Sequence, residues 1–179
     1  MIDPVIELTL LAALALLFAA AAWHKVSDQA RFAASLQAYA LLPTRLIAPS
    51  ALLLPVLECA CAVGLLYAPS REPAAIASMA LLTIYTGAIA TNLARGQREI
   101  DCGCFASSAR VPLSPWLVAR NLILIGAAAL LVAPVRTRAL VWVDQFTVVT
   151  AVLVLWLLSA AARRLAQTGP ELRRLGGHR

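Results

Sequence analysis

Residues 5–23 read VIELTLLAALALLFAAAAW, and Glu7 is the only charged residue among them. A helix that crosses the hydrocarbon core of a bilayer needs roughly 20 apolar residues, so this stretch is long enough to span by itself. A cleaved secretory signal would instead start with basic residues and carry a shorter apolar core. The chain begins with Met1-Ile2-Asp3-Pro4, which is acidic. We therefore expect a retained first transmembrane helix.

Four further apolar stretches reach a comparable length, at residues 46–68, 74–94, 113–133 and 139–162. The chain is 61% hydrophobic and 13% charged, whereas about a quarter of the residues in soluble domains are charged. Backbone groups cannot go unpaired in lipid, and the short alternating segments of a transmembrane barrel do not occur in this sequence. The sequence therefore predicts an all-α fold, a polytopic membrane helical bundle with five transmembrane helices.

Residues 27–43, between the first two spans, predict a short amphipathic helix at the membrane surface. Ser27 or Asp28 can cap its start, and Phe32, Leu36 and Tyr39 share one face. Three polar residues lie off that face: Arg31, Ser35 and Gln37. An ordinary polar connection is the alternative.

Basic residues are distributed unevenly between the two sets of connections that five spans create. One set holds only Arg71, Arg136 and Arg138. The other set holds Lys25, Arg31, Arg45, Arg95, Arg98, Arg110, Arg163, Arg164, Arg173, Arg174 and Arg179. Cytoplasmic connections of membrane proteins carry the excess of Lys and Arg. We therefore expect a multi-pass protein of the inner membrane, with its N-terminus outside and its C-terminus in the cytoplasm.

The composition also indicates how the chain is divided into domains and which partners it has. Residues 1–165 predict one membrane-embedded helical domain, and residues 166–179 predict a basic, disordered cytoplasmic tail. The net charge of +6 does not indicate nucleic acid, because aromatic residues are few and no basic stripe interleaves with them. The lipid bilayer is the partner that the sequence itself predicts.

The polar turn DCGCF, residues 101–105, lies between the third and fourth predicted spans. Gly103 can adopt backbone angles that bring the sulfurs of Cys102 and Cys104 together. A disulfide in so short a ring is strained, and strained disulfides are easily reduced. Labile pairs are typically catalytic or regulatory, so we expect thiol-disulfide exchange at these two cysteines.

The surroundings of the turn leave other interpretations open. Nearby charges oppose one another, because three cations could stabilise a thiolate and two acids would disfavour it: Arg95, Arg98 and Arg120 against Glu99 and Asp101. Two unreactive thiols are one alternative. A Zn²⁺ or Cu⁺ site made by both thiolates and His24 is another, although structural zinc usually has four ligands. No cofactor is predicted, and a quinone or a metal ion is compatible with the sequence.

Alternation of the spans brings several polar residues to the membrane face that carries the cysteine turn. They are candidates for a single polar site: His24, Lys25, Asn92, Arg95, Cys102, Cys104, Arg120 and Asn121. Purely structural roles are the alternatives to a shared polar site. His24 and Lys25 are interpreted as an interfacial anchor, and Asn121 as a residue that bonds another helix.

Glu58 is the one acid deep inside a predicted span, and such a group is a functional candidate by default. Arg120, the only basic residue within a span, is its predicted partner, although helix rise puts it about 10 Å shallower. A structural ion pair and a proton-handling group both fit Glu58.

A second Cys-X-Cys spacing, Cys59 and Cys61, lies within the second predicted span. Residues two apart on a helix point in different directions, so these cysteines cannot bond each other without local unwinding. They also lie about 20 Å from the cytoplasmic start of the span, too deep to reach Cys102 easily. We expect small buried packing residues rather than a second redox pair.

The turn at residues 101–105 resembles that of the MauE family of methylamine utilisation proteins, a family of redox-associated membrane proteins. The resemblance includes the flanking residues Asn92-Leu93, Gly96 and Arg120-Asn121-Leu122, and it extends upstream through Lys25, Phe32, Leu36, Tyr39, Leu42-Pro43, Leu54-Pro55 and Glu58. One departure is Ala106, where the family usually has glycine. The resemblance covers most of the chain, from the first span to the fourth.

The resemblance implies an accessory role in making methylamine dehydrogenase, in maturation, processing or export of its small (beta) subunit. That subunit carries many disulfides and a tryptophan-derived quinone. A periplasmic thioredoxin-like partner, MauD, is expected to work with the family. Composition and spacing by themselves say nothing of methylamine.

Three classes of function are therefore open, and one of them is a membrane scaffold that only docks partners and tolerates both changes described next. A thiol-disulfide protein would use Cys102 and Cys104, whereas a small membrane transporter would use Glu58 coupled to Arg120. In a transporter, Glu58→Gln stops uptake and cysteine replacement is harmless.

Overall fold

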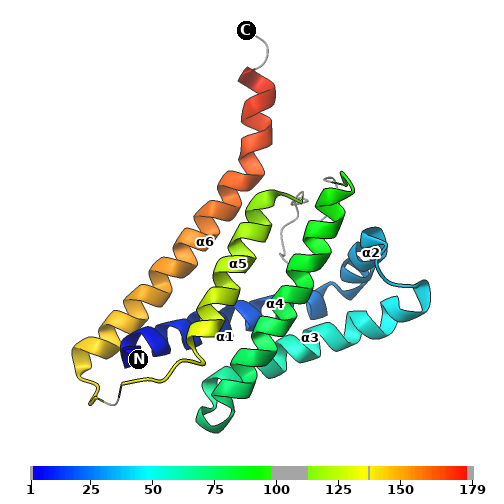
Figure 1. Ribbon diagram of the computed structural model, residues 1–179. Coiled ribbons are helices and arrows are strands. Elements are labelled where there is room, and N and C mark those ends of the chain that lie inside the picture. The colour runs from blue at the N-terminus through cyan, green and yellow to red at the C-terminus, as the bar shows by residue number, and fades with distance from the viewer. Residues whose placement is uncertain (1, 98–112, 137, 177–179) are drawn as a thin grey trace.

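The computed structural model describes residues 2–97, 113–136 and 138–176, with side chains up to residue 161. Figure 1 shows the arrangement of its helices. In chain order they are α1 (Pro4–Ser27), α2 (Gln29–Tyr39), α3 (Thr44–Leu66), the short 3-10 helix η1 (Ala68–Ser70), α4 (Arg71–Ala94), α5 (Pro115–Leu130) and α6 (Trp142–Gly176). The described residues contain no β-strand beyond a single bridge between Ile2 and Val135.

Four helical segments in the described residues are long and apolar enough to cross a membrane: Pro4–Ser27, Thr44–Leu66, Ala68–Ala94 and Trp142–Ala161. The predicted span at 113–133 is shorter than expected, because α5 has 16 residues. At 1.5 Å per residue it is about 24 Å long, less than the hydrocarbon core. Pro115 occupies its first turn, and the chain turns out of the helix just before Pro134. The chain is a multi-pass helical membrane protein, as predicted.

The most extensive helix contacts are those of α1 with α3 and of α4 with α5. Helix α6 lies along α1 (Figure 1). The main apolar core is built from the inner faces of these helices and includes Leu14, Phe18, Leu65, Ala75 and Leu82. Up to residue 161, most large apolar side chains of α6 are exposed, as expected of a lipid-facing surface.

Small residues bring α3 and α4 close together. A Cβ atom added at Gly64 would lie 2.9 Å from the Cβ of Ala74, closer than real side chains approach. In lipid, where apolar burial drives little helix association, such close backbone contact is a main source of packing energy.

α2 is the predicted amphipathic helix. Oδ1 of Asp28 accepts a hydrogen bond from the backbone N–H of Arg31 at 3.1 Å, which caps the helix start. Phe32 and Tyr39 are buried, as expected from their shared face, and Ser35 is buried with them. The prediction that Ser35 lies off this face is wrong: its hydroxyl bonds the carbonyl of Arg31 at 3.1 Å, so it can be buried without losing its partner.

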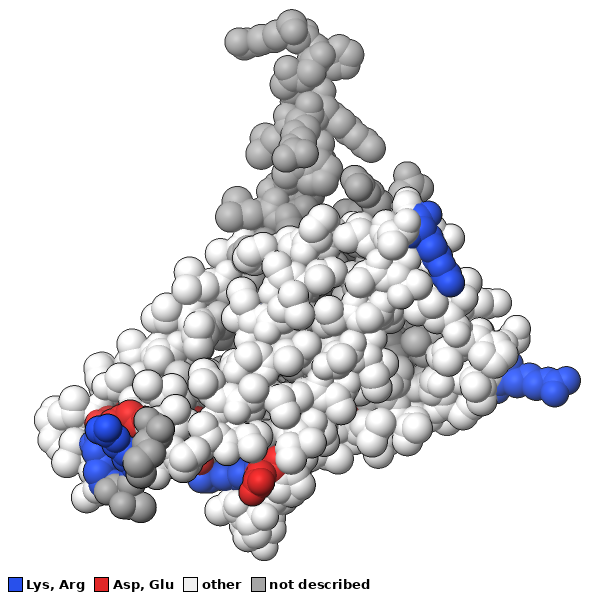
Figure 2. Space-filling model, viewed as in Figure 1, with Lys and Arg blue, Asp and Glu red and all other residues white. Residues whose placement is uncertain are grey.

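One end of the bundle is tied together by polar contacts. The N–H of Arg136 donates to the carbonyl of Ile2 at 2.9 Å, and Arg71 pairs with Glu7 at 3.4 Å. Arg138 lies 3.1 Å from Asp3 and 2.7 Å from Asp144. The structure therefore confirms that Arg71, Arg136 and Arg138 share one end. In Figure 2 the basic side chains at the lower left adjoin acidic ones, whereas those on the right of this view do not.

α6 continues well beyond its membrane-spanning part. The prediction of a disordered tail from residue 166 differs from the structure, which is helical through Gly176. Most residues of this segment are strong helix formers such as Leu, Arg, Glu and Gln. Figure 1 shows this part of α6 projecting away from the other helices.

Candidate functional site

A buried ion pair joins α1 to α3 inside the bundle. The ammonium of Lys25 donates to Oε1 of Glu58, and the two side chains are 3% and 1% exposed. Removing such charges from water costs several kcal/mol for each ion, so a pair persists only where further polar contacts support it. Ionisable groups inside a membrane bundle are for this reason candidates for function.

Two aromatic side chains enclose the Lys25 ammonium. Its Nζ lies 4.9 Å from the centroid of the Tyr85 ring and 5.2 Å from that of Phe32, both within cation–π distance. The Tyr85 hydroxyl donates to Oε1 of Glu58 at 2.9 Å and lies 3.5 Å from Lys25 Nζ. Helices α1, α2, α3 and α4 thus each contribute one side chain to the site.

The polar groups of this interior are not fully paired. Both donors reach Oε1 of Glu58, and Oε2 is buried without a hydrogen-bond partner among the described residues. The same holds for the Ser78 hydroxyl and for Oδ1 of Asn92, whose side chains are both 0% exposed. An unpaired buried polar atom costs about 1–3 kcal/mol. Several such atoms in one interior indicate a functional role or bound water.

Ser78, Tyr85 and Asn92 recur every seven residues, so they lie on one face of α4. That face points into the bundle, since Ser78 and Asn92 are fully buried. The three residues cover about 21 Å along the helix axis. Together with Lys25 and Glu58 they form what we call the polar column.

The sequence of α1 explains why Lys25 points inward. Leu11, Leu14, Phe18, Ala22 and Lys25 are buried and follow one another at intervals of three or four residues. Lys25 therefore ends the inward stripe of α1, in the last helical turn, where the helix dipole also favours a cation. The prediction that Lys25 is an interfacial anchor is wrong.

The partner predicted for Glu58 was Arg120, and the ion pair is instead made by Lys25. The reason lies in helix packing, because α1 runs along α3, whereas α5 lies against α4 and α1. Arg120 is partly buried on α5 and has an interaction of its own.

The described residues on either side of the α4–α5 connection make defined contacts with the two helices. The N–H of Gln97 bonds the carbonyl of Asn92 at 3.0 Å, after Gly96 has taken a left-handed conformation with φ of 75°. Asn121 is buried on α5, with 4% of its surface exposed. The two helix ends and α2 share a small apolar cluster of Tyr39, Ile89, Leu113 and Leu117.

The other predicted site residues lie at the ends of α1 and α4 or outside the described residues. Arg95 is exposed at the C-terminus of α4, and His24 is half-buried in the last turn of α1. Neither belongs to the polar column. Asp101, Cys102 and Cys104 lie outside the described residues, so their thiol chemistry stays a prediction.

Cys59 and Cys61 are free thiols on different faces of α3. Cys61 is buried one turn beyond Glu58, and its thiol adjoins the Ser78 hydroxyl without the geometry of a hydrogen bond. Cys59 is exposed, so the prediction of two buried packing residues is right only for Cys61. No group of three His, Cys, Asp or Glu side chains able to hold a metal occurs in the described part of the chain.

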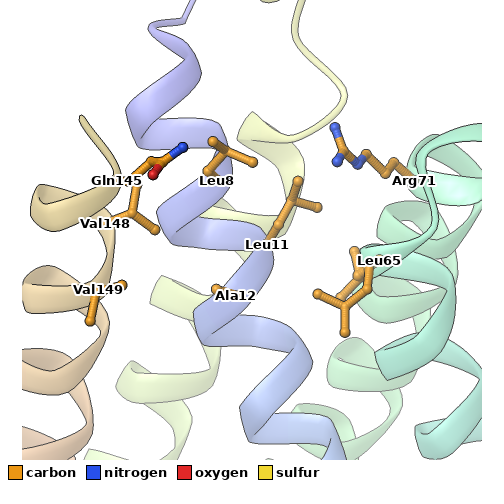
Figure 3. A pocket seen from close by; sticks show the side chains of 9 residues that line it. Leu8, Leu11, Ala12, Leu65, Arg71, Gln145, Val148 and Val149 are labelled. Atoms are coloured by element: carbon orange, nitrogen blue, oxygen red, sulfur yellow. The ribbon is translucent and has the colours of Figure 1, made fainter. Parts of the chain in front are cut away.

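A groove of about 280 Å³ lies between α1, α3 and α6, apart from the polar column (Figure 3). Its walls are mainly apolar, with Leu8, Leu11 and Val149 among them, and Arg71 and Gln145 lie at one end. Such a surface is suited to lipid chains and carries no chemistry of its own.

The family model described as "Methylamine utilisation protein MauE" matches residues 3–134. The chain belongs to the MauE family. Three similar curated proteins all bear the name "Methylamine utilization protein MauE". The one from Paracoccus denitrificans is 43% identical over 128 residues, 72% of this chain and 69% of the relative. That from Paracoccus versutus is 40% identical, covering 73% of each chain, and that from Methylophilus methylotrophus is 43% identical, covering 57% and 54%. No solved structure matches.

The MauE match includes every residue of the polar column and ends before α6 begins at Trp142. Two members of the column, Tyr85 and Ser78, were not found from the sequence. Their signal is the interval of seven that links them to Asn92, a set of polar side chains along one face of an apolar helix.

Proposed function

We propose that this MauE-family protein assists maturation, processing or export of the methylamine dehydrogenase small subunit through thiol-disulfide exchange at Cys102 and Cys104. The observation that carries the proposal is family membership together with the Cys-Gly-Cys spacing in the connection between α4 and α5. The chain is thus an accessory factor for methylamine utilisation. Exchange proceeds by thiolate attack and a mixed disulfide.

The packed ends of that connection support the proposal. The N–H of Gln97 bonds the carbonyl of Asn92, and Leu113 is buried in an apolar cluster with Leu117, so the described residues on either side of the connection are fixed by contacts with α4 and α5. Arg95 and Arg120 stand on the same helix ends and can supply positive charge to a thiolate. Asn121 helps to hold α5 in place from a buried position.

The partners in this proposal are a periplasmic thioredoxin-like protein of the MauD kind and the small subunit itself. We place the protein in the inner membrane with its N-terminus outside and its C-terminus in the cytoplasm. The uneven distribution of basic residues supports this orientation. It puts Cys102 and Cys104 at the cytoplasmic end, so electrons or thiols have to cross the bundle to reach an exported substrate.

The test replaces each thiol singly in cells that depend on methylamine dehydrogenase. Cys102→Ser and Cys104→Ser should each abolish accumulation of the mature enzyme, since one remaining thiol cannot complete an exchange cycle. Cys59→Ser is the matched control, because Cys59 is an exposed free thiol in another helix. It should leave accumulation unchanged. Full accumulation in both test variants would overturn the proposal.

A further inference from the structure

The geometry points to a second site in this molecule, an internal proton-binding site at Glu58. Its free oxygen, Oε2, exchanges protons with the α4–α5 end of the bundle along the polar column. The inference rests on the described interior alone and stands whether or not Cys102 and Cys104 exchange disulfides. The ligand of this interior site is a proton, which water delivers.

The packing of the site selects this ligand. Glu58 and Lys25 are 1% and 3% exposed, and the rings of Tyr85 and Phe32 close the space around the ammonium. A proton needs no cavity of its own. Oε2 is the one carboxylate oxygen that receives neither the Lys25 nor the Tyr85 hydrogen bond, so it is the acceptor left for a proton.

The proton-transfer step is balanced without a further reactant. A hydronium ion gives its proton to Oε2 of the Glu58 carboxylate, which forms an O–H bond, and a water molecule is released. Release of the proton reverses the step. The faces of Tyr85 and Phe32 stabilise the Lys25 ammonium, and proton binding at Oε2 changes the charge of the carboxyl group by one unit.

Asn92 gives the proton a route toward the α4–α5 end. It lies seven residues, or about 10 Å, beyond Tyr85 on the same buried face of α4. Its Nδ2 bonds the carbonyl of Ala88 at 3.1 Å, while Oδ1 has no partner among the described residues. A chain of buried waters that begins at this oxygen would connect it to the Glu58 carboxyl group, since buried waters satisfy polar atoms of this kind.

Three titratable groups adjoin Glu58 in the described interior. Lys25 faces it from α1, Tyr85 from α4, and Cys61 lies one turn along α3. From α2, the ring of Phe32 lies beside the Lys25 ammonium. Of these groups, Glu58 is the acid whose protonation infrared spectroscopy can detect directly.

The first test follows the carboxyl stretching band of the full chain in lipid vesicles as the pH is lowered. The parent should develop a band of a protonated buried carboxyl that shifts in D₂O, and Glu58→Gln should lose it. Glu7→Gln is the matched control, because Glu7 is also an ion-paired acid but lies near the other end, against Arg71. It should keep the band. Identical titrations of the parent and Glu58→Gln would overturn the inference, leaving the pair a structural one.

The second test locates the route by the rate at which the Glu58 carboxyl exchanges its proton for deuterium. Asn92→Leu should slow the exchange, because leucine has nearly the same size and cannot bond water. Thr91→Val should leave the rate unchanged, since Thr91 is exposed on α4 outside the polar column and its hydroxyl bonds the carbonyl of Gly87. If Asn92→Leu fails to fold, Asn92→Val carries the same prediction. Equal rates in the parent and in the folded Asn92 variant would exclude this route.

Discussion

Glu58 shows how much a single side chain can constrain a membrane bundle. Its carboxylate is 1% exposed and receives Lys25 and Tyr85 on one oxygen. Removing one member of a buried ion pair leaves the other charge without compensation, which is much more costly than replacing both by apolar groups. The pair therefore requires an alignment of α1 and α3 that keeps Lys25 in contact with Glu58.

A double-mutant cycle tests this requirement. Lys25→Met and Glu58→Leu should each lower the free energy of unfolding by on the order of 3 kcal/mol, because each leaves an uncompensated buried group. The double variant Lys25→Met/Glu58→Leu should be less destabilised than either single variant. Denaturation by a titrated detergent, followed by circular dichroism, measures all four proteins. Additive losses in the double variant would show that the two residues do not interact.

At the scale of elements, α3 and α4 meet where Gly64 has no side chain. A Cβ there would come within 2.9 Å of the Ala74 Cβ, which is attached to the backbone and cannot rotate away. The two helices would have to separate. This contact brings α3 and α4 together near η1, the 3-10 helix that connects them.

Gly64→Ala should therefore destabilise the bundle by about 1–3 kcal/mol, the usual cost of overpacking. Gly87→Ala is the matched control, since Gly87 lies within α4 and a Cβ there meets nothing within 4 Å. Its stability should stay equal or rise by about 0.5–1 kcal/mol, because alanine is the better helix former. The same detergent denaturation compares them. Equal losses at both positions would contradict the close contact.

The N-terminus of α1 is the second element-scale feature. Hydrogen bonds from Arg138, and then from the N–H of Val5, lower the pKa of Asp3 from its ordinary value of 3.8. A lowered folded-state pKa adds stability that is present above the ordinary value and is lost as the pH falls through the lowered one. This contact should therefore loosen only in acid.

Amide hydrogen exchange can follow this loosening at Arg136, whose N–H bonds the carbonyl of Ile2 at 2.9 Å. After correction for the intrinsic pH dependence of exchange, protection should fall as the pH drops below about 4. Asp3→Asn should have lower protection at neutral pH and a weaker pH dependence. The prediction fails if the parent and Asp3→Asn respond to acid alike.

At the scale of the whole molecule, the two ends of the bundle differ in how their charges are arranged. Near the N-terminus, Arg71 and Arg138 pair with acids, whereas Arg45 and Arg95 are exposed at the other end. Figure 2 shows this contrast on one face. Cytoplasmic ends of membrane bundles carry the excess of basic residues, so the end with Arg45 and Arg95 should face the cytoplasm.

Single cysteines introduced at each end of a chain whose native cysteines are serine can test this orientation. Ala139→Cys should react with a membrane-impermeant maleimide added to intact cells, and Arg45→Cys should react only after the membrane is opened. Both positions are exposed, so accessibility within the protein does not decide the result. Labelling of Arg45→Cys in intact cells would invert the orientation.

The helical class and four of the five spans followed from the sequence alone, whereas α5 is shorter than predicted. In lipid, backbone polar groups can form hydrogen bonds only within the protein, so long apolar runs such as residues 5–23 form helices. The amphipathic helix α2 was also predicted, because Asp28 and the spacing of Phe32 and Tyr39 are local signals. Cys102 and Cys104 were predicted as a reactive pair from their spacing, and this stays a prediction because they lie outside the described residues.

Only the tertiary structure decided which faces of those helices meet. A helix that is apolar on all sides has no sequence pattern that shows which side faces the bundle. For this reason Lys25 was predicted to be an interfacial anchor and Arg120 to be the partner of Glu58. The packing of α1 along α3 turned Lys25 inward and brought Tyr85 to the same carboxylate oxygen. Bilayer solvation determines that helices form, whereas the contacts between helices determine which buried charges pair.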